Sequence, residues 1–119
     1  MKKLIAWVEI PTVNFERAVA FYCAVLELEL EALDFGSEKM ACFPSGEGAI
    51  IFAPGFIPSS DGVLVSFDTG TGLDSTLERI LQHGGKIVIP KTKIQAENRG
   101  WFAVFSDCEG NKLGLYGDQ

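Results

Sequence analysis

The residues most able to do chemistry lie near the start of the chain, where the carboxylate of Glu9 stands two positions after the indole of Trp7. Residues 4–10 alternate in hydrophobicity and end at Pro11, which predicts a β-strand with Trp7 and Glu9 on one face. A carboxylate partly desolvated beside aromatic rings can act as a general acid or base, or hold a cationic ligand. Glu9 is therefore the predicted catalytic residue. Its structural alternative is an ion pair with a basic residue of a later loop: Lys91, Lys93 or Arg99.

The other reactive side chains point to structural roles. His83 is the single histidine and stands beside Gly84 and Gly85 at the end of a predicted helix, where a surface position is expected. Tyr22 recurs at helical spacing and is predicted to pack in the core. The three cysteines show no paired spacing, which favours a reduced cytoplasmic protein. Cys108 has no neighbouring histidine or cation to activate it, so a catalytic thiol is not expected.

Composition limits the class of protein. The chain has 119 residues, a formal net charge of −6 and a sequence pI near 4.7. That length suits a single domain over residues 1–119. The acidic balance argues against a nucleic-acid partner, because such proteins need a basic surface. No apolar run is long enough to cross a bilayer, so we expect a cytoplasmic protein without membrane association.

The chain contains an internal repeat. Residues 40–55 align with residues 102–117 without a gap. The identical pairs are Ala41 and Ala103, Phe43 and Phe105, Glu47 and Glu109, Gly48 and Gly110, and Gly55 and Gly117. A period of about half the chain predicts two copies of one structural module, about 1–58 and about 59–119, sharing one core.

Each half is predicted to run strand, helix, strand, strand, strand. In the first half the strands are 4–10, 28–33, 39–43 and 49–53, with a helix capped by Asn14. In the second half the strands are 63–69, 86–89, 101–105 and 112–116, with a helix at 73–83. Pro90 is expected to end its strand, and the polar residues 91–99 are expected to form a loop over the mouth of the sheet.

Several of these segments resemble one family. The motifs are Val8-Glu9-Ile10-Pro11, then Asn14-Phe15-Glu16-Arg17-Ala18-Val19-Ala20-Phe21-Tyr22, and finally Gly100-Trp101-Phe102-Ala103 with Asp107-Cys108-Glu109-Gly110-Asn111. They are similar to the vicinal oxygen chelate superfamily, which holds glyoxalase I, the bleomycin and fosfomycin resistance proteins and the extradiol dioxygenases. The resemblance implies an α+β fold in which two βαβββ modules form an incomplete barrel around a cavity. It does not by itself imply a reaction.

The resemblance also implies where a divalent metal would be held. The family positions map onto Trp7, Phe52, Leu64 and Gly114, and the last of these stands where the family usually has a glutamate. None of these side chains can donate a lone pair to a metal. If the mapped positions are moved by two residues along each strand, Glu9 and Ser66 become the candidate ligands. Two ligands are too few for a catalytic metal site. We therefore expect no metal and no other cofactor.

What remains at the expected site is apolar and aromatic, with one acid. The predicted ligand-binding residues are Trp7, Glu9, Phe52, Leu64, Ser66, Trp101 and Gly114. Such a wall suits a partly hydrophobic small molecule, and the leading prediction is a metal-independent binding protein. The alternatives are a lyase or isomerase, similar to lactoylglutathione lyase and possibly metal-dependent, and an interaction module whose cavity is plugged by Trp7 and Phe52. The resemblance further implies a homodimer.

Overall fold

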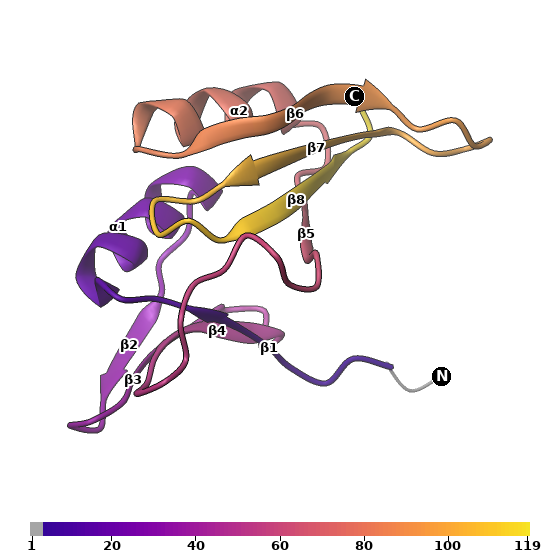
Figure 1. Ribbon diagram of the computed structural model, residues 1–119. Helices are drawn as coiled ribbons and strands as arrows, with labels where there is room; N and C mark the ends of the chain where they lie inside the picture. The colour runs from indigo at the N-terminus through magenta and orange to yellow at the C-terminus, as the bar shows by residue number, and fades with distance from the viewer. Residues whose placement is uncertain (1–3) are drawn as a thin grey trace.

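The computed structural model describes residues 4–119 as two four-stranded sheets and two helices (Figure 1). The first module comprises β1 (Val8–Pro11), α1 (Phe15–Leu26), β2 (Glu31–Asp34), β3 (Lys39–Cys42) and β4 (Gly48–Phe52). The second comprises β5 (Ser66–Asp68), α2 (Leu73–Gln82), β6 (Lys86–Lys93), β7 (Trp101–Ser106) and β8 (Lys112–Gly117). The predicted order of elements in each half is confirmed.

Both sheets have the same topology. The strand orders are β1-β4-β3-β2 and β5-β8-β7-β6, with the first pair of each sheet parallel and the others antiparallel. β1 and β5 are therefore equivalent edge strands, one in each sheet. The α+β class and the two βαβββ modules are confirmed, and the two sheets are not closed into a barrel.

Two strands depart most from their predictions. The first was predicted over residues 4–10, but β1 begins only at Val8, so Trp7 lies before the strand and not within it.

The other strand is β6, which is longer than predicted. The strand continues to Lys93 instead of ending at Pro90, and its pairing with β7 shifts register between Ile87 and Thr92. Proline lacks an N–H for a sheet ladder, but it is tolerated on an edge strand where the pairing is irregular. The expected loop over residues 91–99 is therefore shortened to the tip of a long β6–β7 hairpin, which projects from the body of the molecule (Figure 1).

The helix ends follow the sequence signals. The Asn14 side chain accepts a hydrogen bond from the Arg17 N–H at 3.1 Å, and Glu16 lies in the first turn of α1. Both features stabilise a helix N-terminus, one by satisfying a free donor and one by opposing the helix dipole. After α2, Gly84 adopts a φ of 96°, the left-handed conformation that glycine favours at a helix C-terminus.

The two modules share one hydrophobic core, as the chain length requires. α1 contributes Phe21 and Tyr22, both at most 2% exposed, and their rings contact the second module. Phe21 stacks on Phe105 with centroids 6.5 Å apart, and Tyr22 meets Phe67 at 6.0 Å. Burial of such large apolar surfaces is the main favourable term in folding, so the modules depend on each other for stability.

The opposite face of each sheet carries no helix. In the first sheet Ile10, Ile50 and Ala41 pair side by side and are buried in the core beneath α1. Side chains alternate along a strand, so the face bearing Glu9 points away from α1. We call this the helix-free face of the sheet. No helix within residues 4–119 is long and apolar enough to span a membrane.

Candidate functional site

Trp7 and Glu9 lie together, as predicted. The Trp7 indole N–H donates a hydrogen bond to a carboxylate oxygen of Glu9 at 3.2 Å. The prediction that the Glu9 carboxylate is partly desolvated is wrong for the single chain, because Glu9 is exposed and Trp7 retains 42% of its accessible surface. Glu9 also takes no part in the four ion pairs found among residues 4–119, so the alternative pairing with a loop cation does not form here.

These two residues line a pocket of about 480 Å³ between β1 and the segment that connects the modules. Phe56, Ile57 and Val63 supply apolar walls, and Lys112 of β8 adds one positive charge. The volume falls within the usual range for small-molecule sites, which also combine apolar walls with a few polar groups. We call this the Trp7–Glu9 pocket.

Two predicted residues come together on the second sheet, where Ser66 of β5 pairs with Gly114 of β8. Leu64 precedes β5 and is not part of the sheet. A methyl group added at Gly114 would lie 2.2 Å from the Ser66 hydroxyl oxygen. The space that glycine leaves is therefore taken by Ser66. Leu64 is 47% exposed.

Phe52 and Trp101 lie elsewhere, which corrects their assignment to the same wall as Trp7. Phe52 points to the helix side of its sheet, where the Lys39 ammonium lies 5.9 Å from its ring. Trp101 shares a face with the buried Ala103 and packs against the core, with the Lys91 and Lys93 ammonium groups 4.9 and 5.9 Å from its ring. Neither ring faces Glu9, and Phe52 does not plug the Trp7–Glu9 pocket.

Turn length explains the misplacement of Phe52. Phe43 pairs with Gly48 across residues 44–47, whereas its counterpart Phe105 pairs with Leu113 across residues 106–112. The ungapped repeat is therefore correct for the third strands, but for the fourth strands it is off by three residues, which is an odd number. An odd shift moves every side chain to the other face. On the helix-free face Glu9 therefore pairs with Ala49, and Pro11 pairs with Ile51; both partners are buried. Ala49 lies beside Glu9 as Gly114 lies beside Ser66, so Ala49 is the counterpart of Gly114 in the first sheet.

The family's metal site finds no ligand set in this chain. With the register of the strands, the family's ligand positions hold Trp7, Ala49, Leu64 and Gly114, whose side chains carry no lone pair for a metal. Within residues 4–119 no three His, Cys, Asp or Glu side chains come close enough together to hold an ion. The residues present do not fit the metal centre that the fold family implies.

A second cavity was not predicted from the sequence. It measures about 470 Å³ and lies between the two edge strands, on the other side of β1 from the Trp7–Glu9 pocket. Val8 and Ile10 line it from β1, Phe67 from β5, and Phe43 from the end of β3. We call it the seam cavity. From the sequence alone, each of these residues would be assigned to the hydrophobic core of its own module. No signal in the sequence shows how the edge strands β1 and β5 face each other.

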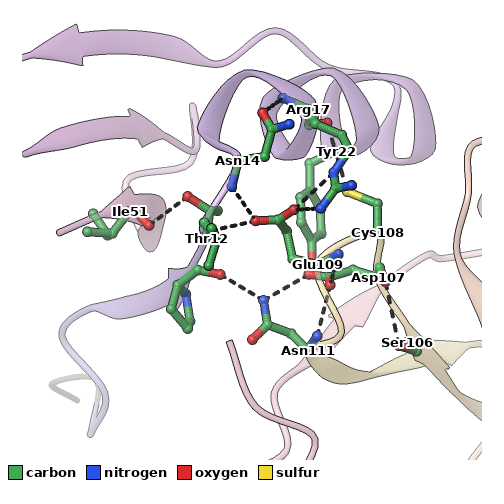
Figure 2. A network of polar contacts seen from close by, with 12 residues as sticks. Thr12, Asn14, Arg17, Tyr22, Ile51, Ser106, Asp107, Cys108, Glu109 and Asn111 are labelled. Atoms are coloured by element: carbon green, nitrogen blue, oxygen red, sulfur yellow. Dashed lines mark hydrogen bonds and ion pairs between the residues drawn. The ribbon is translucent and has the colours of Figure 1, made fainter. Parts of the chain in front are cut away.

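A cluster of polar contacts joins the β7–β8 turn to the start of α1, and sequence reasoning missed its central residue (Figure 2). One carboxylate oxygen of Glu109 accepts hydrogen bonds from the Val13 N–H and from the Asn14 N–H at 2.7 Å. The other oxygen accepts from Arg17, whose Nε lies 3.0 Å away. The Glu109 side chain is only 1% exposed. An anion at a helix N-terminus satisfies free donors and opposes the helix dipole, so Glu109 stabilises the contact between modules.

The same turn contains a second set of hydrogen bonds. Asp107 accepts from the Tyr22 hydroxyl at 2.6 Å and from the N–H groups of Glu109 and Asn111 at 2.8 and 2.9 Å. The Asn111 amide donates to the Pro11 carbonyl at 2.8 Å. This confirms that the segment is a hairpin turn with local side-chain bonds, with Gly110 at a φ of 92°. It also joins α1, β1 and the last hairpin.

The electrostatics of this cluster are those of a structural centre. Burial acts to raise the Glu109 pKa, but the hydrogen bonds from Arg17 and from the Asn14 and Val13 amides outweigh it, so the pKa lies below its ordinary value. Burial and the adjacent carboxylate raise the Tyr22 pKa well above its ordinary value. Burial, with the nearby acids, also raises the pKa of the Cys108 thiol to about 11. A thiol held protonated is a poor nucleophile, in agreement with the sequence prediction.

Comparison with known proteins establishes the family. Residues 4–115 match the model of the Glyoxalase/Bleomycin resistance protein/Dioxygenase superfamily. No curated protein matches the chain. Among solved structures, a glyoxalase/bleomycin resistance protein/dioxygenase family enzyme from Burkholderia phytofirmans PsJN has a TM-score of 0.73 and 17% identity, over 97% of this chain and 98% of that one.

Two further structures show the same fold. The fosfomycin resistance protein FosX from Listeria monocytogenes has a TM-score of 0.72 and 16% identity, with 100% and 96% of the two chains covered. A glyoxalase I mutant from Zea mays has a TM-score of 0.74 and 20% identity, over 95% of this chain and 45% of that one. At these identities the structures support the fold alone. With the family model matching residues 4–115, the chain belongs to the glyoxalase/bleomycin resistance protein/dioxygenase superfamily.

Proposed function

We propose that this protein is a metal-independent small-molecule binding protein whose ligand contacts Trp7 and Glu9. The observation that carries the proposal is the indole of Trp7, which stays 42% exposed in a pocket of about 480 Å³ with apolar walls. Large aromatic side chains are usually buried, and an exposed indole within a concave apolar site is suited to stacking on a ligand. Its hydrogen bond to Glu9 fixes the orientation of the ring.

Metal independence is supported by the side chains at the expected ligand positions. Trp7, Ala49, Leu64 and Gly114 offer no ligand atom, and a methyl group at Gly114 would already meet the Ser66 hydroxyl. For comparison, the E126Q mutant of FosX from Listeria monocytogenes is complexed with Mn(II) and 1S,2S-dihydroxypropylphosphonic acid. We infer that this chain has kept the fold and lost the metal chemistry.

We also propose that the protein is a cytoplasmic homodimer. The chain leaves large apolar side chains accessible, among them Trp7, Leu33 and Leu64 at 42, 37 and 47%. Exposed apolar side chains of this size are typical of an interface, and a second copy covering Trp7 would enclose the Trp7–Glu9 pocket. The cysteines Cys23, Cys42 and Cys108 are unpaired, which suits a reducing compartment.

The alternative function is a lyase or isomerase of the same superfamily. One observation favours it: Glu9 lies in the pocket with no ion-pair partner among residues 4–119, so its carboxylate is available to take or deliver a proton. Turnover that Glu9→Gln abolishes without weakening ligand binding would establish this alternative in place of simple binding.

The first experiment is elemental analysis of chelator-treated protein, with thermal-shift titrations of zinc, nickel, manganese, iron(II) and cobalt. Metal independence predicts no stoichiometric metal and no stabilisation by any of these ions, since an ion that binds the folded state raises its stability. About one tightly held metal per chain would overturn metal independence and direct attention to metal-dependent lyase assays.

The ligand site is tested with the two tryptophans of the chain. Trp101→Phe leaves Trp7 as the only indole, and Trp7→Phe leaves Trp101, which serves as a matched control beneath two lysines. A ligand from a screen of small aromatic compounds should quench the fluorescence of the first variant saturably and leave the second unchanged. Equal quenching of both variants, or of the second alone, would place the ligand elsewhere. A screen without any saturable quenching would favour an interaction module.

A further inference from the structure

The seam cavity has the dimensions and walls of a small-molecule site that is separate from the Trp7–Glu9 pocket. Its volume is about 470 Å³, and its apolar lining includes Val8, Phe43 and Phe67. Phe43 and Phe67 meet nearly edge to face, with centroids 5.9 Å apart, and so form a fixed aromatic wall. Both edge strands contribute, so the cavity exists only because the two modules dock.

Among residues 4–119, the charged side chains that line this cavity are all acidic. Glu47 lies at the β3–β4 turn and Asp68 at the end of β5, and both are exposed at the cavity lining. Within residues 4–119 neither carboxylate belongs to an ion pair, although one oxygen of Asp68 accepts from the Gly70 N–H at 2.9 Å. The remaining polar side chains of the lining are Ser45 and Ser66, and no lysine, arginine or histidine of the described part of the chain lines the cavity.

The lysines that would favour an anionic ligand lie on another part of the molecule. Lys91 pairs with Asp74 of α2, and Lys93 donates to the Arg99 carbonyl at 2.6 Å. Both ammonium groups lie against Trp101, on the core face of the second sheet, and not at the seam. The fold therefore keeps Lys91 and Lys93 away from this cavity.

We propose that the seam cavity binds an organic cation with a hydrophobic body, such as a primary or quaternary amine. Val8, Phe43 and Phe67 contact the apolar body, and Glu47 and Asp68 hold the cationic group at the rim. Aromatic walls also attract a cation directly, so the two kinds of contact act together. The site is independent of the Trp7–Glu9 pocket, with which it shares only Ile5, Val8, Ile10 and Val65.

The test uses three probes of one shape and different charge: 4-phenylbutylamine, 4-phenylbutanol and 4-phenylbutanoate. Isothermal titration should show the amine binding about fivefold or more tightly than the alcohol, with the carboxylate weakest. The preference for the amine should decrease between about 0.02 M and about 0.3 M NaCl, because the carboxylates are exposed and are screened by salt. Equal affinities for the three probes would refute selection by charge.

Variants locate the site. Glu47→Gln and Asp68→Asn should each weaken amine binding by up to about fivefold while leaving the affinity for the alcohol unchanged. Glu29→Gln and Asp34→Asn remove equally exposed carboxylates away from the cavity and serve as matched controls. If the two pairs of variants behave alike, the effect comes from net charge and the proposal is wrong.

Two further variants separate this site from the proposed function. Ala6→Phe narrows the seam cavity, and Val63→Phe changes only the lining of the Trp7–Glu9 pocket. We expect Ala6→Phe to reduce amine affinity at least about tenfold and Val63→Phe to leave it unchanged. The reverse result would refute the seam site but leave the Trp7–Glu9 pocket in place. Far-UV circular dichroism and thermal unfolding check that both variants are folded.

Discussion

Removing the Glu109 carboxylate should destabilise the protein strongly, because this one side chain satisfies the start of α1 from the other module. In Glu109→Ala the N–H groups of Val13 and Asn14 lose their acceptor, and Arg17 loses its partner. Arg17 is 55% exposed and regains water, so its share is small. The variant loses the hydrogen bonds to the charged Glu109 carboxylate and its interaction with the helix dipole. Together these losses should lower the free energy of unfolding by about 2–4 kcal/mol.

The measurement is equilibrium unfolding in urea at one fixed protein concentration, because assembly makes apparent stability depend on concentration. Glu16→Gln is the matched control, since its carboxylate also pairs with a cation near α1, that of Lys39, but its side chain is 76% exposed. We expect a change of at most about 0.5 kcal/mol for the control. A loss below about 1 kcal/mol for Glu109→Ala, or equal losses for the two variants, would refute the reasoning.

The same carboxylate predicts a pH dependence. The folded-state pKa of Glu109 lies below its unfolded value, so the unfolded chain binds the proton more readily. The stabilisation is then complete above the unfolded pKa and is lost as pH falls from about 5 toward the folded pKa. Glu109→Gln should lower stability at neutral pH and show a shallower loss in acid. Parallel curves for the variant and the natural chain over this range would contradict the prediction.

Three further predictions concern neighbouring parts of the molecule. Tyr22→Phe removes the donor to a buried carboxylate and should cost about 1–3 kcal/mol of unfolding free energy, measured by urea denaturation; a neutral effect would show that water replaces the hydroxyl. Cys108 should react with a thiol reagent at pH 8 far more slowly than a free cysteine, because its pKa is near 11, and rapid stoichiometric modification would contradict the burial of its thiol. Gly48→Ala should cost about 2–4 kcal/mol, because the added methyl would lie 2.2 Å from the Val8 carbonyl oxygen and force β1 from β4. Gly62→Ala, which meets nothing within 4 Å, is its control, and equal melting temperatures for the two would refute the contact.

Local signals in the sequence predicted the elements well. Asn14 caps α1, Gly84 follows α2, and Gly110 takes the left-handed conformation in the last turn. These features depend on residues a few positions apart, so they are visible in the sequence. β6 departs from its prediction because the effect of Pro90 depends on whether its strand lies at the edge of the sheet.

The internal repeat predicted the two modules but not the equivalence of individual residues. Glu47 and Glu109 are identical in the alignment and play different parts: one lines the seam cavity and the other caps α1. Phe52 was matched with Gly114, yet the unequal turns place the two on opposite kinds of face. A difference of three residues between the two turns cannot be seen in an ungapped match, but because three is odd it reverses the side-chain alternation.

The sequence by itself determined the family, the two modules, the pairing of Trp7 with Glu9 and the lack of metal-ligating side chains at the family's positions, because these follow from residue types and short-range spacing. Only the tertiary structure decided which face Phe52 and Trp101 occupy. It also decided that two edge strands from different modules enclose a cavity whose charged lining residues, within 4–119, are Glu47 and Asp68. These depend on strand register and on module docking. Both are set by contacts between residues distant in the chain, which no local pattern encodes.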